Sequence, residues 1–257
     1  MSLLSEERKR VIIELIDQHG RVKVNNLARD FEVSTETVRR YLEALENEKK
    51  LKKVYGGAVK IEQEEEPALF EREVLRMEEK QRIAEKAVSF IENGDMIFID
   101  EGSTTLQMVP YLCALSDITV ITNSFPVASY LITFSNQRKF NGETIFIGGT
   151  VKNNHFRTSG SLAERMAQEF FADKAFIAID GLDPSRGITS YDIEKSMMTK
   201  IYMEQASEIY ALADHSKIGK KANYKMAELK AVDKVLSDSD IPDDWTISND
   251  ICEWIKC

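Results

Sequence analysis

The regular alternation of short apolar runs with helical patterns over residues 75–257 constrains the fold more than any other feature of this chain. The runs have the composition of buried strands, and amphipathic segments lie between several of them. The expected strands are residues 96–100, 118–122, 144–148, 175–180, 208–213 and 234–238, and the expected helices include 103–115, 125–134, 161–171 and 194–206. Alternation of this kind predicts an open, mostly parallel α/β sheet.

Small and polar residues follow nearly every expected strand. In such sheets ligands bind at the carboxyl ends of the strands, which share one edge. Glycine permits close backbone approach, helix N-termini attract anions, and hydroxyls can donate to phosphate oxygens, whereas Asp and Asn suit sugar hydroxyls. The candidates at this edge are Asp100, Gly102, Ser103, Thr104, Thr105, Asn123, Ser124, Gly148, Gly149, Asp180, Gly181, Asp183 and Lys217. Together they predict a site for a small, polyhydroxylated, phosphorylated molecule.

Each of these motifs, taken alone, has a structural alternative. The Gly-Ser-Thr-Thr stretch of residues 102–105 is also a common start of a capped helix. Lys217 is equally consistent with a surface lysine, and His155 and His215 are expected to be structural or exposed rather than ligands. The prediction therefore depends on the agreement among five strand ends.

Residues 1–60 carry a different pattern, which predicts a helix-turn-helix. An apolar stripe at helical spacing indicates a first helix that Gly20 closes. A shorter helix follows within residues 22–33, and Ser34 is placed to cap a third helix, with Thr37 where a capping box would have glutamate.

The third helix offers the groups that a DNA-recognition helix needs. Its apolar residues fall on one face, and hydroxyls and two arginines fall elsewhere. The first turns of a recognition helix enter the major groove, where arginine can read guanine or hold phosphates. The candidate DNA-binding residues here are Ser34, Thr35, Thr37, Arg39 and Arg40. The alternative is an ordinary amphipathic helix with a solvated charged face.

The next stretch, residues 49–61, favours DNA binding. It has the pattern strand, Gly-Gly turn, strand, with four lysines before the turn and one after it. A basic hairpin directly after a recognition helix is a wing, whose expected contact residues are Lys52, Lys53, Gly56 and Gly57. Residues 1–60 are therefore predicted to be a winged helix-turn-helix that binds double-stranded DNA.

The charge distribution agrees with this division. Residues 1–60 carry 13 Lys and Arg against 10 Asp and Glu, a net +3, whereas the remainder carries 21 against 33, a net −12. Only the basic part is expected to meet a polyanion. An acidic linker is expected over residues 61–74, with an exposed break at Glu62 to Pro67 and a helical pattern from Leu69 to about Ile91, before an effector-sensing α/β domain at 75–257.

Other features bound the localisation. No apolar run approaches the roughly 20 residues that span a bilayer, and the N-terminus lacks the apolar core of a signal peptide. Three cysteines form no metal-type pair. We expect a cytoplasmic protein with reduced thiols, no membrane partner and no metal site.

The motifs of residues 1–60 resemble the N-terminal domain of the DeoR family of bacterial transcriptional regulators. The family pattern has an arginine with apolar residues at four-residue spacing, followed after a spacer by a small residue, threonine, an apolar residue and basic residues. The matching positions are Arg8, Ile12, Ile16, Ser34, Thr37, Val38, Arg39 and Arg40. Tyr41 stands where the family usually has aspartate, and Tyr55 begins a Tyr-Gly-Gly where the family has His-Gly-Gly.

The remainder resembles the effector domain of the same family, which is similar in fold to ribose-5-phosphate isomerase. The matching stretches are "GSTT", "ITNSFPVA", "IGGTVKNNHFRTSG", "AFIAIDGLDPSRGITSYDIEK" and "ALADHSKIG". The resemblance implies a phosphate turn at residues 102–105, an aspartate cluster at Asp180 and Asp183, and a late lysine at Lys217. Glu194 is then similar in place to the glutamate that moves the substrate proton in the isomerase.

The resemblance implies binding without turnover. The glycine-rich run that a lysine opens in the isomerase is missing, and Arg186-Gly187 stands in its region. Proton transfer at a carbonyl needs a base and an oxyanion stabiliser together. No catalytic residue and no cofactor are therefore expected.

The sequence thus predicts a DNA-binding transcription regulator, a repressor of carbohydrate-metabolism genes controlled by a phosphorylated sugar or related metabolite. A dimer or tetramer is expected because one winged helix reads too few base pairs for a specific site. Two alternatives stay open: a sugar-phosphate isomerase-like enzyme with an accessory DNA-binding head, and a DNA-binding scaffold whose effector site is vestigial.

Overall fold

The chain forms two compact units, residues 1–64 and 65–257, which are described separately. The structure is a computed structural model that describes residues 3–48, 50–59, 69–245 and 251–257. The acidic break at Glu62 to Pro67 and the lysines at positions 49 and 60 lie outside the described residues. Of the helices in the described ranges, none combines the length and apolar character needed to cross a membrane.

The first unit is a winged helix-turn-helix, as predicted. Its elements are α1 (Leu3–His19), β1 (Arg21–Lys23), α2 (Val24–Asp30), α3 (Thr35–Asn47), β2 (Lys52–Val54) and β3 (Gly57–Val59). The strands form an antiparallel sheet in the order β1-β3-β2. Gly20, at a φ of 72°, donates its N–H to the Ile16 carbonyl at 2.8 Å, which confirms the predicted end of α1.

One apolar core holds the first unit together. The stripes of the three helices meet in it, and β1, β3 and the residue before β2 close it. Its most buried members are Ile12, Ile16, Leu27, Val38, Leu42, Leu45, Leu51 and Ala58. Most charged residues between the stripe positions remain on the outside, as amphipathic helices require, and the buried Lys9 pairs with Glu6 at 2.6 Å.

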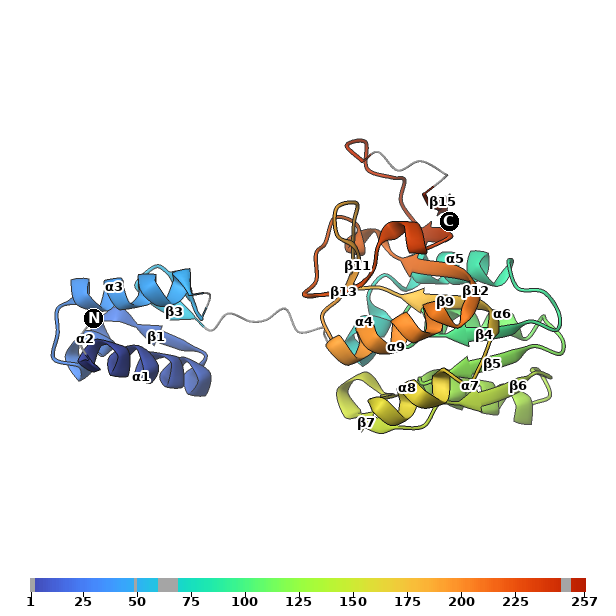
Figure 1. Cartoon of the computed structure of the whole chain (residues 1–257), viewed down its shortest axis with the longest axis horizontal. Helices are drawn as coiled ribbons and strands as arrows, with labels where there is room; N and C mark the ends of the chain where they lie inside the picture. Colours follow the sequence, from blue (N-terminus) through green and yellow to red (C-terminus); the bar gives the residue numbers. More distant parts are fainter. Residues whose placement is uncertain (1–2, 49, 60–68, 246–250) are drawn as a thin grey trace. The chain divides into compact units, whose positions relative to one another are not determined.

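The second unit is built on a seven-stranded sheet in which every pair of neighbouring strands is parallel. Its order is β15 (Glu253–Lys256), β14 (Lys234–Ser237), β12 (Ala206–Ala213), β9 (Ala172–Ala178), β4 (Met96–Ile99), β5 (Thr119–Thr122) and β6 (Glu143–Phe146). All six expected strands are present in this sheet, which confirms the predicted fold class. The strands β12, β9, β4, β5 and β6 follow one another across the second unit in Figure 1.

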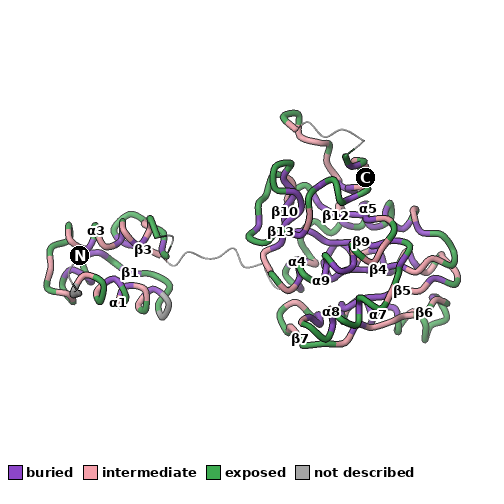
Figure 2. Tube along the Cα trace, in the orientation of Figure 1, coloured by how far each residue is buried: buried purple, intermediate pink, exposed green. Residues whose placement is uncertain are grey.

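Helices cover both faces of this sheet. Alternation along β4 sends Ile97 and Ile99 into one core and Phe98 into the other. The first core contains residues of α5 (Met77–Val88), η1 (Thr105–Met108), α6 (Val109–Leu112) and α7 (Phe125–Asn136), and the second contains residues of α8 (Ser161–Ala167) and α9 (Ile193–Glu204). Figure 2 shows the central strands as buried, which explains why their sequences are continuous apolar runs.

Two small antiparallel sheets and several short helices were not predicted. One sheet pairs β7 (Thr150–Lys152) with β8 (Arg157–Ser159), and the other has the order β10 (Gly181–Asp183), β11 (Gly187–Ser190), β13 (Tyr224–Ala227). The additional 3-10 helices are η2 (Asn153–His155), η3 (His215–Lys217) and η4 (Leu229–Ala231). These strands are three or four residues long and partly polar, so they lack an apolar run.

The helical pattern from Leu69 to Ile91 is two helices rather than one. Arg76, at a φ of 55°, separates α4 (Leu69–Val74) from α5, and a left-handed residue cannot continue a helix. α4 occupies the C-terminal part of the expected linker 61–74, yet Leu69 and Arg72 are buried in the second unit. Those six residues are therefore part of the sensor fold.

Candidate functional site

The recognition helix α3 begins where the sequence predicts. Ser34 caps it, because its Oγ accepts a hydrogen bond of 3.1 Å from the Thr37 N–H and lies 2.9 Å from the Thr37 hydroxyl. Val38, Leu42 and Leu45 are buried against α1 and α2. This packing fixes which face of α3 is left for a partner.

The opposite face of α3 carries the candidate DNA contacts. Thr35, Arg39 and Arg40 are exposed, and Thr37 is half-buried. Arg39 Nη1 lies 3.4 Å from Glu36 Oε2, an exposed pair that contributes little to stability. Both guanidinium groups are therefore available to a DNA duplex at little cost.

The wing hairpin is held by its second glycine and by α3. A Cβ at Gly57 would lie 2.0 Å from the Val22 carbonyl oxygen, so only glycine lets β3 pair with β1 here. The Lys53 N–H donates to Glu46 Oε1 at 2.8 Å, which ties the hairpin to α3. Lys52 and Gly56 are exposed and Lys53 is half-buried.

Two groups of the candidate effector residues, the turn 100–105 and Asp180, lie at a topological switch point of the sheet. The chain leaves β4 toward β5 and β6 on one side and returns to β9 on the other side. Ligand sites of parallel sheets lie outside the carboxyl ends of the two strands at such a point. Here those ends carry the turn 100–105 after β4 and Asp180 after β9.

The turn after β4 contains two kinds of hydroxyl. Thr105 Oγ1 donates to the carbonyls of Asp100 at 2.8 Å and Gly102 at 3.1 Å, so it stabilises the turn itself. The side chains of Ser103 and Thr104 make no hydrogen bond to any residue that the structure describes, although they are only 5% and 6% exposed. These two hydroxyls can still bind a ligand.

Two residues fix the position of this turn against the sheet. A Cβ at Gly102 would lie 2.2 Å from the Ala178 side chain, so glycine permits close contact with β9. Asp100 is fully buried and accepts hydrogen bonds from the Glu101 N–H and the Thr199 hydroxyl, both at 2.9 Å. Burial raises the pKa of Asp100 to about 7.

Glu101 is the centre of a buried charge network that sequence reasoning missed. Arg157 Nη1 donates to Glu101 Oε1, while Lys195 Nζ lies 3.8 Å from the same oxygen and Arg72 Nη2 lies 3.7 Å from Oε2. Burial opposes ionisation of Glu101, but Lys195, Arg157 and Arg72 together lower its pKa well below the usual range. Arg157 also pairs with Asp192 at 2.9 Å.

Asp180 joins this network to Lys217. Lys195 Nζ lies 3.1 and 3.2 Å from the two Asp180 carboxylate oxygens, and the Ser190 hydroxyl donates to Oδ2 at 2.7 Å. Lys217 Nζ lies 4.0 Å from Asp180 Oδ1 and keeps partial exposure. Asp180 and Lys217, two of the predicted edge residues, therefore lie close together, and Lys195, which was not predicted, contacts Asp180.

Other predicted residues of the edge have structural roles. Asn123 is buried and its Nδ2 donates to the Thr158 carbonyl at 2.9 Å, and Ser124 caps α7 through a 3.5 Å bond from the Val127 N–H. Gly148 is half-buried and Gly149 is exposed, and both follow β6 after Ile147. The Asn123 Oδ1 has no hydrogen-bond partner among the described residues, so this amide retains an acceptor.

Gly181, Asp183 and Glu194 take part in other contacts. A Cβ at Gly181 would lie 2.5 Å from the Lys220 carbonyl oxygen. Asp183 accepts bonds from the N–H and hydroxyl of Ser185 and pairs with Lys221 at 3.1 Å. Its contacts therefore support a turn-stabilising role. Glu194 Oε2 lies 2.7 Å from both the Ser159 hydroxyl and Lys152 Nζ.

The missed residues carried a weak signal in the sequence. Glu101 stands beside Asp100, and Arg157 and Lys195 lie within "IGGTVKNNHFRTSG" and "AFIAIDGLDPSRGITSYDIEK", two stretches that carried the family resemblance. Their partners are distant in sequence, because Arg157 meets Glu101 across 56 positions. No local periodicity reveals a contact of that kind.

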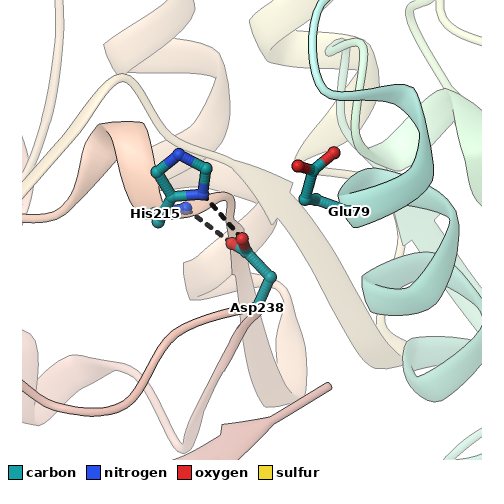
Figure 3. A group of neighbouring side chains, drawn as sticks. All are labelled: Glu79, His215 and Asp238. Atoms are coloured by element: carbon teal, nitrogen blue, oxygen red, sulfur yellow. Dashed lines mark hydrogen bonds and ion pairs between the residues drawn. The ribbon is translucent and has the colours of Figure 1, made fainter.

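One group among the described residues could bring together three metal-ligand atoms: Glu79, His215 and Asp238, whose ligand atoms lie within 4.8 Å of one another. In Figure 3, His215 faces Asp238 while Glu79 extends from α5 on the other side. The His215 Nδ1 and Asp238 Oδ2 atoms are 2.6 Å apart, a hydrogen-bond distance. A shared metal would have to separate them, so the contacts support a hydrogen-bonded pair.

Family models match both units of the chain. Residues 8–64 match the DeoR-like helix-turn-helix domain, and residues 75–239, more than half of the chain, match the DeoR C terminal sensor domain. The chain belongs to the DeoR family. It is therefore a DNA-binding transcriptional regulator of the helix-turn-helix type.

Curated relatives in this family are similar over most of their length. The uncharacterised HTH-type transcriptional regulator YulB of Bacillus subtilis is 34% identical over 92% of this chain and 90% of its own length. The HTH-type transcriptional repressor GlcR of the same organism is 31% identical over 92% and 89%. Both cover the two DeoR domains found here.

A solved structure outside the family is more distantly similar. Ribose 5-phosphate isomerase A from Methanocaldococcus jannaschii has a TM-score of 0.39 and 20% identity, covering 55% of this chain and 54% of its own. A similarity of this size supports no inference about activity.

Proposed function

We propose that this DeoR-family regulator represses carbohydrate-metabolism genes in the cytoplasm and that a phosphorylated sugar or related metabolite controls its binding to operator DNA. The observation that carries the proposal is the switch-point turn, where the Ser103 and Thr104 hydroxyls make no hydrogen bond to the described protein. The name of GlcR, a transcriptional repressor, supports the direction of control.

The roles of the remaining edge residues follow from their contacts. Ser103 and Thr104 bind the phosphate group of the effector, with Lys217 nearby. Asp180, which already orders Lys195 and Lys217, faces the sugar end. Asn123 offers its unpaired carbonyl oxygen to a sugar hydroxyl. A direct contact with the effector is least supported for Asp183, Gly181 and Thr105. The contacts of each of these residues already stabilise the turn or strand that contains it.

The sensor unit binds the effector without converting it. A general base needs a pKa near the working pH. Burial acts to raise the pKa of Glu194, but its hydrogen bonds to Lys152 and Ser159 outweigh burial and lower it. A carboxylate stabilised in its ionised form is a poor proton acceptor, so Glu194 fits a structural role better than a catalytic one.

A homo-oligomer, a dimer or a tetramer, completes the proposal. Two winged helices in one oligomer bind a palindromic operator more tightly than one does, without new contacts. Once the first is bound, the second binds in an intramolecular step.

A thermal-shift screen of phosphorylated sugars tests the effector class. A ligand at a hundredfold excess over its dissociation constant stabilises the fold by about 2.7 kcal/mol. We expect at least one sugar phosphate to raise the melting temperature while its unphosphorylated sugar does not. Equal effects of the two forms would remove the phosphate from the proposal.

A further inference from the structure

The helix α4 is the first described element after residues 60–68, which separate it in sequence from the winged helix. Its apolar anchoring is slight. Leu69 is buried, whereas Phe70 and Val74 are 61% and 69% exposed. A short helix with one buried apolar side chain depends on polar contacts for its position, and such elements open at low free-energy cost.

Those polar contacts join α4 and the residues after it to the turns that form the proposed effector site. Arg72, which is 6% exposed, places Nη2 3.7 Å from Glu101 in the turn after β4. Lys80 of α5 donates from Nζ to the Arg72 carbonyl at 2.6 Å. Arg76 Nε lies 3.6 Å from Asp214, directly before η3. α4 is thus attached to the turn after β4 and to Lys80 of α5, and Arg76, which joins α4 to α5, contacts the turn after β12.

The groups that hold α4 form a cluster with excess positive charge. Arg72, Arg76, Lys80 and Lys217 influence one another there, and the carboxylates that face them are Glu101, Asp180 and Asp214. Burial is the main cause that lowers the pKa of Lys80 to about 8. Asp214 acts to raise this pKa, and repulsion from Lys217, Arg72 and Arg76 acts to lower it. Lys80 nevertheless stays mostly charged at pH 7, so an additional anion would relieve this repulsion.

The cluster is also close to the hydroxyl turn. α5, which carries Lys80, packs against η1, the helix that continues from Ser103 and Thr104. Arg76 and Lys217 keep 37% and 21% of their side chains exposed, so a ligand can reach them.

We propose that the anionic group of the effector is bound jointly by the hydroxyl turn and by Arg76 and Lys217, in the positive field of the buried Arg72 and Lys80, so that effector binding locks α4 onto the sensor unit. The inference rests on the proposed function and adds the route of regulation. An anion that binds more tightly when α4 is docked than when α4 is undocked must favour the docked state by the same factor. The lock therefore acts on the described element of the sensor unit that lies nearest in sequence to the winged helix.

Hydrogen exchange of the full chain tests this inference, with inorganic phosphate as the probe and sodium chloride to hold ionic strength constant. We expect phosphate to slow exchange of the α4 amides several-fold in the wild type. Arg76→Gln should abolish this protection, because it removes a charge that is proposed to bind the anion. Asp214 loses this partner but still accepts a hydrogen bond from the Ser216 N–H. Arg82→Gln, a control at an exposed position of α5, should behave as the wild type. Unchanged exchange in β9 of each variant verifies the fold.

Thermal shift under the same conditions separates the two proposals. Phosphate that raises the melting temperature of the wild type but leaves α4 exchange unchanged would overturn this inference and leave the effector site standing. Equal α4 protection in Arg76→Gln and in the wild type would also overturn it. If phosphate does not raise the melting temperature of the wild type, both the anion site and the lock are overturned.

Discussion

Arg39 is the residue on which sequence-specific binding should depend most. It lies exposed on the outer face of α3, and among the described residues its guanidinium is engaged only by a weak pair with Glu36. If Arg39 reads a base, Arg39→Ala should weaken operator binding by about 1–3 kcal/mol. A fluorescence-anisotropy titration at fixed salt measures this change.

The matched control is Arg10→Ala, at an exposed α1 arginine that pairs with Glu14 in a similar way. The control should retain the wild-type affinity. A normal affinity of Arg39→Ala for a cognate operator would remove Arg39 from the base-reading set.

Asp100 makes stability depend on pH in an unusual direction. Its pKa is about 7 in the folded state because it is fully buried, against an ordinary value of 3.8. As the pH rises, the folded state therefore keeps this proton to a higher pH than the unfolded state does. The contribution of Asp100 to the free energy of unfolding is fully present below pH 4 and is lost as the pH rises to 7.

Asp100→Asn removes this loss and keeps the local hydrogen bonds, since its amide can accept from the Glu101 N–H and donate to the Thr199 hydroxyl. We expect the variant to melt several degrees above the wild type at pH 8. Thermal melts between pH 5 and pH 8 should show the difference growing up to about pH 7 and then levelling. A difference independent of pH would mean that Asp100 is ionised throughout.

Sequence reasoning succeeded at residues whose partners are local. The cap at Ser34 and the end of α1 at Gly20 need only neighbours within four positions. Glu101, Arg157 and Lys195 escaped notice because their buried ion pairs join residues 15 positions apart, as in Lys195–Asp180, to 56 or more, and such pairs leave no periodic trace.

At the scale of elements, the wing hairpin should bind phosphates rather than bases. Lys52 and Lys53 lie on β2 beside the recognition helix. Replacing both with glutamine should weaken binding to all DNA sequences alike and reduce the slope of log affinity against log salt by about two units at most.

The control for the wing replaces Lys225 and Lys230 of the sensor unit, two exposed lysines that pair with Glu228. That double variant should keep the wild-type slope. If the wing variant keeps it as well, Lys52 and Lys53 face solvent in the complex.

The major strands were predictable and the short ones were not. β4, β5 and β9 are buried on both faces, so each leaves an apolar run that the sequence displays. β7 and β8 form a short hairpin whose residues include Lys152 and Arg157, and its position depends on contacts elsewhere in the fold. The break between α4 and α5 at Arg76 could not be predicted from the sequence either, because residues in the left-handed conformation are usually glycine or asparagine.

At the scale of the whole molecule, Glu194 distinguishes a sensor from an enzyme. If no proton is moved, Glu194→Gln should leave the operator response to a sugar phosphate largely intact, since glutamine can still accept from Ser159. An aldose–ketose isomerisation assay run beside the DNA titration gives the second readout. Steady conversion of an aldose phosphate by the wild type, abolished in this variant, would make the sensor unit an enzyme.

The central claim is that a phosphate bound at the turn after β4 controls the binding of DNA by the first unit. The most direct measurement is operator affinity with and without the sugar phosphate that stabilises the wild type, compared between the wild type and Thr104→Glu. The new carboxylate would face the incoming phosphate in a largely desolvated site, where like charges repel strongly. The control Thr133→Glu places the same charge at an exposed position of α7.

The account predicts that all three proteins bind operator equally well without effector and that only Thr104→Glu fails to respond when the sugar phosphate is added. A Thr104→Glu variant that retains the full response would contradict it and place the phosphate elsewhere.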